Sequence, residues 1–299
     1  MNVTVIGLGL IGGSMAKDLR KTGFATCLTG VEANEQHARE ALELGLVDRV
    51  LPLEQAVQKA DMVILAIPVD KICGMLPRVL GLIREGTTVT DMGSTKRSIV
   101  REVENHPRRK NYIAAHPMSG TENSGPQAAL ENLFVGKIAI ICDHEQSGPQ
   151  HLALVEKMFQ TFGMEMAYMS ADEQDHNTAF ISHLPHAAAF ALANTVQGKE
   201  DRSIICDLAS GGFRSTVRLA KSSPEMWGPI FRQNRDYIVE SLDVYIRHLK
   251  ELKESIKHDE TKMYALMHNA NGIREILNGN KPGLIRNEEK IVKFYTRKK

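Results

Sequence analysis

The stretch Val3-Thr4-Val5-Ile6-Gly7-Leu8-Gly9-Leu10-Ile11-Gly12 decides the fold of this chain. Its four β-branched residues predict a strand, and residues 10–20 have the pattern of a helix. The glycines between them match G-x-G-x-x-G, a turn in which the backbone approaches a pyrophosphate at the helix N-terminus and the helix packs closely on the strand. We therefore expect a dinucleotide to be bound by Gly7, Gly9, Leu10, Ile11 and Gly12.

An acidic residue follows where such a site requires one. Glu32 comes directly after a second predicted strand, residues 26–31, and 20 residues after Gly12. Its carboxylate can accept hydrogen bonds from both ribose hydroxyls and repels a 2′-phosphate. Residues 30–37 contain no arginine that could pair with such a phosphate. We therefore expect the cofactor to be NAD rather than NADP.

The first half of the chain continues the alternation of apolar runs and helical patterns. Further runs occupy residues 61–67, 87–90, 112–115 and 137–142. Strands that alternate with helices predict a doubly wound parallel sheet, so the fold class is a Rossmann-type α/β domain. From about Asp172 onward the pattern is helical. We expect residues 1–167 to form the dinucleotide-binding domain and residues 168–299 to form an all-α domain for substrate binding and dimerisation.

A long helical repeat in the second half has two interpretations. Apolar residues recur at steps of four and three at Ile238, Leu242, Tyr245, Leu249, Leu252 and Ile256. Steps that alternate between four and three add up to heptads, which are typical of a coiled-coil seam. A second helix is predicted over residues 260–277. The seam either packs within the chain or forms a contact between two subunits.

Composition argues against several classes of protein. Of the 299 residues, 37 are Lys or Arg and 36 are Asp or Glu, and this balance argues against a nucleic-acid partner. No apolar run reaches the roughly 18 residues of a membrane span, so we expect no membrane contact. The four scattered cysteines suit the cytoplasm and argue against a zinc or disulfide scaffold. A basic segment, residues 281–299, is expected to be a solvated terminus.

Polar clusters after the predicted strands 87–90 and 112–115 mark the expected site of chemistry. Asp91–Lys96 and His116–Glu122 follow strands whose carboxyl ends meet at the ligand-binding edge of the sheet. His116 is either a general base, since histidine titrates near neutral pH, or a loop-stabilising residue.

The helical half adds two further polar clusters. His183 and His186 share one helix face, but no acid lies nearby, so we expect no metal. Either Arg214 or Arg218 could hold a carboxylate bidentately.

Together these residues resemble the prephenate dehydrogenase family, including its arogenate-using members. The resemblance runs from the glycine turn to about Leu249. It depends on the motifs GLGLIGGS, DMGSTK, AHPMSGTENSG, SHLPHAAAFAL, GGFRSTVRLAKSSPEMW and on Asn234. The chain departs from the family pattern at Gln174, where many relatives carry a histidine.

The resemblance implies an activity and a set of roles. It implies NAD-dependent oxidative decarboxylation of prephenate to 4-hydroxyphenylpyruvate, on the route to tyrosine, by a cytoplasmic homodimer that joins through the helical domain. His116 would accept the proton of the C4 hydroxyl, with Ser94 as the second catalytic residue. The implied substrate-binding residues are His186, Arg218, His183, Lys96 and Thr121. The alternatives are an arogenate or β-hydroxyacid-type dehydrogenase, and a non-catalytic NAD-binding regulator.

Overall fold

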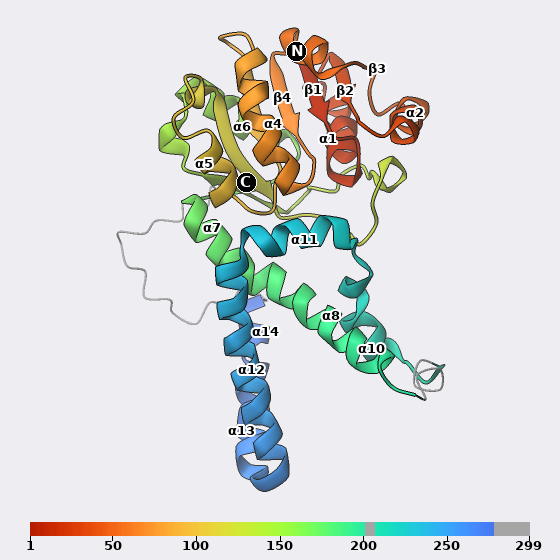
Figure 1. The fold of residues 1–299 in the computed structure, drawn as a ribbon, viewed down its shortest axis with the longest axis vertical. Coiled ribbons are helices and arrows are strands. Elements are labelled where there is room, and N and C mark those ends of the chain that lie inside the picture. Colours follow the sequence, from red (N-terminus) through yellow and green to blue (C-terminus); the bar gives the residue numbers. More distant parts are fainter. Residues whose placement is uncertain (201–206, 278–299) are drawn as a thin grey trace.

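The computed structural model describes residues 1–200 and 207–277, and it divides into a sheet-containing part and a helical part (Figure 1). Cys206 and the basic segment 281–299 lie outside the described residues. Within the described residues, no helix is long and apolar enough to cross a membrane.

One eight-stranded sheet runs in the order β3-β2-β1-β4-β5-β6-β7-β8. The strands are β1 (Asn2–Ile6), β2 (Cys27–Val31), β3 (Arg49–Val50), β4 (Met62–Leu65), β5 (Thr88–Asp91), β6 (Tyr112–Pro117), β7 (Ile138–Cys142) and β8 (Glu165–Met169). Strand order reverses at β1, which has β2 on one side and β4 on the other, as in a doubly wound fold. The α/β fold class predicted from the sequence is confirmed.

One strand pairing differs from the all-parallel sheet that we expected. Strand β7 is antiparallel to β6, with His116 opposite Ile140. The reason is the connection, because residues 118–137 form loops and a short 3-10 turn in place of a crossover helix. This long connection carries the residues that follow His116 back across the carboxyl edge of the sheet.

Two apolar cores cover the two faces of the sheet. Along β4, Met62 and Ile64 face one core while Val63 and Leu65 face the other, which is the alternation of a strand buried on both sides. The first core includes α1 (Leu10–Lys21) and α6 (Pro149–Thr161). The second includes α3 (Leu53–Gln58), α4 (Val69–Leu82) and α5 (Arg97–Glu102). A short outer helix, α2 (Glu35–Glu43), buries only Ala41.

The helical part begins after β8 and extends away from the sheet (Figure 1). Its elements are α7 (Ala171–Thr178), a π-helical turn (Ala179–His183), α8 (Leu184–Gln197), α10 (Gly211–Thr216), α11 (Pro224–Gln233), α12 (Arg235–His258), α13 (Glu260–Asn271) and α14 (Ile273–Leu277). Helix α11 joins the second sheet core through Trp227 and Ile230. Helix α13 folds back along the long helix α12.

The predicted seam lies on α12 and is only partly covered within the chain. Ile238 is buried at its N-terminal end, and Leu242 and Leu252 are half-buried. Tyr245, Leu249 and Ile256 are exposed, the last at 63%. Packing within the chain therefore explains part of the repeat and leaves an apolar face on α12.

Candidate active site

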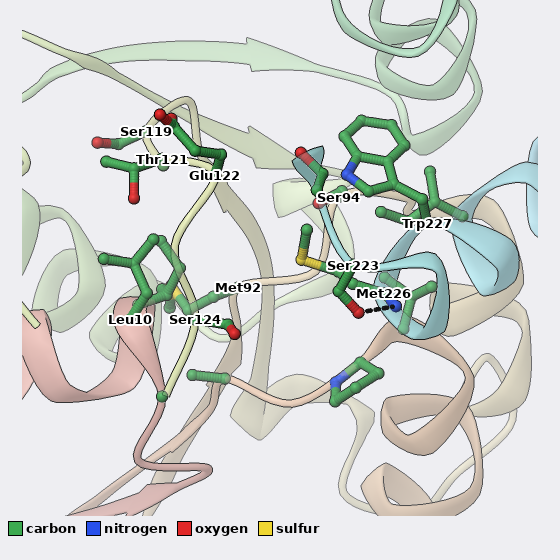
Figure 2. Close-up of a pocket in the computed structure, with 18 of the residues that line it drawn as sticks. Leu10, Met92, Ser94, Ser119, Thr121, Glu122, Ser124, Ser223, Met226 and Trp227 are labelled. Atoms are coloured by element: carbon green, nitrogen blue, oxygen red, sulfur yellow. Dashed lines mark hydrogen bonds between the residues drawn. The ribbon is translucent and has the colours of Figure 1, made fainter. Parts of the chain in front are cut away.

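A cavity of about 690 Å³ opens between the carboxyl edge of the sheet and the helical part. Its walls come from the glycine turn, from Ser94, from the segment His116–Gly125 and from helices α8 and α11. Figure 2 shows Leu10 and Thr121 on one side of this space and Ser94 and Trp227 on the other. The cavity therefore joins the expected cofactor site to the expected site of chemistry.

The glycine turn has the shape that a pyrophosphate cradle requires. Gly7 lies at φ +91°, a conformation that side chains disfavour, and its N–H donates to the Val31 carbonyl at 2.9 Å. Gly9 is the N-cap of α1 and lines the cavity with Leu10 and Ile11. A Cβ on Gly12 would lie 1.9 Å from the Gly7 oxygen, so the closeness of helix and strand excludes any larger residue. The N-terminus of α1 is thereby open to an anion.

Glu32 stands at the end of β2 and lines the same cavity. One carboxylate oxygen accepts the Leu8 N–H and the other accepts the Asn34 N–H, each at 3.0 Å. These bonds hold the carboxylate in a fixed orientation and leave each oxygen further acceptor capacity. A ribose diol fits this arrangement, since it would donate to a carboxylate that is already positioned.

His116 belongs to strand β6 and lies at the inner end of the cavity. Its Nδ1 lies 2.9 Å from Nε2 of Gln174, a residue of α7. Burial lowers the pKa of His116 to about 3, and the nearby Lys96 and His183 act in the same direction. The imidazole is therefore neutral at physiological pH, as a proton acceptor must be.

The DMGSTK motif divides into a cavity residue and a buried ion pair. Ser94 lines the cavity, whereas Lys96 is completely buried and pairs with Asp91. Asp91 also accepts the hydroxyl of Tyr112 at 2.6 Å. The Lys96 ammonium therefore contacts a buried carboxylate and does not line the cavity.

Two of the side chains that were expected to bind substrate, Lys96 and His183, do not line the cavity. Lys96 is held by Asp91, and His183 is completely buried, with its Nδ1 3.1 Å from Nδ2 of Asn234. Burial, with a contribution from His186, lowers the pKa of His183 to about 4. Both side chains are buried, and His183 lies against Trp227, which lines the cavity.

His186 and Arg218 line the cavity from the helical side. The His186 ring stacks on Trp227, with centroids 3.5 Å apart and an interplanar angle of 24°. Arg218 forms an ion pair with Glu122 at 2.8 Å, across the mouth between the two parts of the chain. The alternative cation, Arg214, does not line the cavity and donates to the Ala209 carbonyl.

The segment after His116 forms the wall opposite the helices. Thr121 and Glu122 both line the cavity, as the motif led us to expect. Gly125 approaches the cofactor end. A Cβ placed on it would lie 3.7 Å from Nε2 of His37, and a Cβ placed on Gly9 would lie 4.0 Å from the Gly125 amide nitrogen. This segment therefore borders the cofactor end as well as the chemical end.

The sequence analysis assigned no site role to three residues that the structure places at the site. Gln174 contacts His116, Trp227 lines the cavity beneath His186, and Asn234 supports His183. Trp227 is the only tryptophan in the chain and lies in the GGFRSTVRLAKSSPEMW motif, so its rarity could have marked it. The sequence does not indicate the histidine contacts of Gln174 and Asn234, because each contact joins segments that are distant in the chain.

No metal centre is found in the described part of the chain, because no group of three His, Cys, Asp or Glu side chains is placed to hold an ion there.

Comparison with known proteins gives matches to both halves of the chain. The family model described as "Prephenate dehydrogenase, nucleotide-binding domain" matches residues 15–168. The model described as "Prephenate dehydrogenase, dimerization domain" matches residues 170–269. A prephenate dehydrogenase of Bacillus subtilis is 31% identical over 264 residues, which cover 87% of this chain and 71% of the relative.

Solved structures agree with the sequence matches. A prephenate dehydrogenase of A. aeolicus, in complex with hydroxyphenyl propionate and NAD+, has a TM-score of 0.86 and 31% identity, covering 93% of this chain and 98% of that one. An arogenate dehydrogenase of Synechocystis has a TM-score of 0.73 and 30% identity, covering 93% of this chain and 100% of that one.

The buried neutral histidines predict a loss of stability in acid. The pKa values of His116 and His183 lie below 6.5 in the folded protein, so below about pH 6.5 the unfolded chain binds more protons. Each histidine then lowers the free energy of unfolding by roughly 1.4 kcal/mol per pH unit, until its folded pKa is reached. Urea unfolding at several pH values between about 7 and 5 measures this slope.

The variant His183→Gln isolates one contribution. We expect a shallower pH slope in His183→Gln and an unchanged slope in His268→Gln, because His268 is exposed on α13. Equal slopes in wild type and His183→Gln would contradict the burial argument.

Proposed function

The chain belongs to the prephenate dehydrogenase family, and on that premise we propose that it catalyses the NAD-dependent oxidative decarboxylation of prephenate to 4-hydroxyphenylpyruvate. One observation carries the proposal: a single cavity joins the cradle at Gly9 and Glu32 to the neutral imidazole of His116 and the guanidinium of Arg218. The A. aeolicus relative was crystallised with NAD+ and hydroxyphenyl propionate, and this supports binding of NAD and an aromatic-type acid in the cavity of the present chain.

The cofactor end of the cavity fits NAD. Gly7, Gly9, Leu10, Ile11 and Gly12 would hold the pyrophosphate at the N-terminus of α1, and Glu32 would accept from the ribose hydroxyls. NAD supplies the two-electron acceptor of the oxidation when it is bound there. The carboxylate of Glu32 disfavours a 2′-phosphate, which supports NAD over NADP.

His116 is the proposed base. As C4 of prephenate is oxidised, its hydroxyl becomes more acidic, and the neutral imidazole accepts the proton. The bond from C1 to the ring carboxylate then breaks and CO2 leaves. The electron pair of the broken bond completes the aromatic ring, and the proton returns from His116 to the phenolic oxygen. Ser94, which also lines the cavity, would contact the hydroxyl or orient His116.

The helical wall is proposed to bind the carboxylates of the substrate. Arg218 is the cation that lines the cavity on this side, and a guanidinium can bind a carboxylate bidentately. His186, stacked on Trp227, and Thr121 would complete the pocket. Because Arg218 is paired with Glu122, a substrate carboxylate must compete with that side chain.

Arogenate is the second candidate substrate. It carries an amino group where prephenate carries a keto group, and the carboxylate of Glu122 lines the cavity, where it could attract an ammonium. The similarity to the arogenate dehydrogenase of Synechocystis supports arogenate as a candidate substrate.

We also propose that the helical part of the chain forms a homodimer. This part begins after β8, so the boundary lies after Met169, two residues later than the boundary at residue 167 expected from the sequence. The exposed face of α12 and α13 includes Tyr245, Leu249, Ile256, Tyr264 and Met267. A second copy would cover this face, and the dimerization-domain match over residues 170–269 supports it. The free thiols of Cys27, Cys73 and Cys142 fit the proposed cytoplasmic location.

A direct assay tests the function. Purified protein with NAD should form NADH and release CO2 from prephenate, and a parallel assay with arogenate ranks the two substrates by kcat/KM. His116→Asn should lower kcat by about 10²–10⁴-fold. Absence of turnover with both substrates would refute the proposed function, whereas a nearly unchanged kcat in the variant would refute only the role of His116.

The two arginines provide a matched pair for substrate binding. Arg218→Ala should raise KM by about 10- to 100-fold, because a charged hydrogen-bonded contact to a carboxylate is lost. Arg214→Ala should leave KM within about twofold, since Arg214 does not line the cavity. The assignment is overturned when the two variants exchange these effects.

Light scattering tests the dimer. Wild type should have twice the mass of one 33.2 kDa chain, and Ile256→Asp should shift the population to monomer, because a carboxylate would be buried at the interface. Val135→Asp is the control, since Val135 is also exposed, at 57%, but lies on the sheet domain. A monomeric wild type would exclude the dimer.

A further inference from the structure

We propose that Gln174 is a positioning residue that sets the tautomer of His116, holding the imidazole proton on Nε2 in the free protein. Gln174 lies on α7 and is completely buried. Its Nε2 lies 3.1 Å from the Ser94 carbonyl oxygen and 2.9 Å from Nδ1 of His116. One amide group therefore contacts both the backbone of Ser94 and the ring of the proposed base.

The Ser94 carbonyl determines which end of the amide occupies this position. A carbonyl oxygen can only accept, so the amide atom beside it must be the nitrogen, which has two hydrogens to donate. Turning the amide over would place two oxygens 3.1 Å apart in a buried site. The second hydrogen of the amide then points at Nδ1 of His116, which must accept it.

The proton of neutral His116 is consequently on Nε2. Nδ1 uses its lone pair on the Gln174 hydrogen, so it cannot also carry a proton. Within the described part of the chain, Oε1 of Gln174 has no hydrogen-bond partner, and the amide is thus held by its nitrogen alone.

A second amide in the same region has an equivalent arrangement. Asn234 Nδ2 lies 2.6 Å from the Asp175 carbonyl oxygen and 3.1 Å from Nδ1 of His183. The Asp175 carbonyl again requires a donor, so Nδ1 of His183 is again an acceptor. Two neighbouring buried histidines are therefore held in the same tautomer by the same chemistry.

The catalytic consequence rests on the proposed function. A base that accepts the substrate hydroxyl proton at Nε2 needs a lone pair there, so its proton must be on Nδ1. The Gln174 amide must then turn, so that Oε1 accepts from Nδ1 and the Ser94 carbonyl loses its donor. Because Ser94 also lines the cavity, a ligand that displaces Ser94 can release the amide and prepare the base.

Nitrogen NMR of the full-length protein tests the tautomer directly. Protein labelled with 15N-histidine reports which ring nitrogen is protonated, and loss of a signal pair in His116→Asn assigns His116. In the free wild type at neutral pH we expect Nε2–H in about tenfold excess over Nδ1–H, as expected for one hydrogen bond to a buried nitrogen. A free protein with the proton on Nδ1 would overturn the proposal.

Two variants complete the test. Gln174→Glu replaces the donor with a group that accepts when ionised, so the proton should move to Nδ1. Thr178→Val is the control, since the Thr178 hydroxyl is buried on the same helix and donates to the Gln174 carbonyl without reaching His116. A proton that stays on Nε2 in folded Gln174→Glu contradicts the proposal, and if that variant does not fold the wild-type spectrum alone decides.

These results are independent of the substrate. Lack of turnover with prephenate and arogenate would refute the proposed function and leave the tautomer of the free protein measurable. An Nδ1–H tautomer would refute the role of Gln174 and leave the dehydrogenase activity intact.

Discussion

The carboxylate of Asp175 ties the two parts of the molecule together. It is completely buried and accepts the backbone N–H groups of Lys96 and Arg97, at 2.7 Å and 3.1 Å. Burial raises the pKa of Asp175, while these two bonds and the Arg97 guanidinium favour the charged form. The first turn of α5 is thereby joined to α7. Arg97 extends the junction, since its Nη2 donates to both carboxylate oxygens of Asp236 on α12.

The site depends on this junction because residues that support the site lie next to Asp175. Gln174 precedes Asp175 and contacts both Ser94 and His116, while Asn234 donates to the Asp175 carbonyl. A shift of α7 would therefore move the support of His116 and of His183 together. The π-helical turn that follows α7 places His183 inside and leads into the helix that carries His186 to the cavity. Such turns are frequent at functional sites.

Much of the fold could be predicted because its signals are local, as in the glycine turn and the spacing of Glu32. The antiparallel placement of β7 could not, because it depends on a long connection whose path is set by packing. The same distinction holds for the site. Motif positions indicate His116, Ser94 and Arg218 as residues of one cavity, but they do not indicate depth. Lys96 is two residues from Ser94, yet it faces a buried carboxylate while Ser94 faces the cavity. How deeply a side chain is buried and which group it contacts depend on tertiary structure. The motif alone therefore predicts a substrate contact for Lys96, which the structure instead places against Asp91.

The electrostatics of the cavity bear on how a nearly neutral chain would recognise the proposed substrate, prephenate, which is a dianion. The formal net charge is only +1, so overall attraction between protein and substrate is weak. Recognition must come from local groups, and Arg218 already has a partner in Glu122. A substrate carboxylate that replaces Glu122 exchanges one ion pair for another, so its gain in free energy comes from better geometry and from removal of water, and not from net charge. The exchange would also free the Glu122 carboxylate, which lies on the segment that begins at His116. Binding at Arg218 would therefore be linked through this segment to the proposed base.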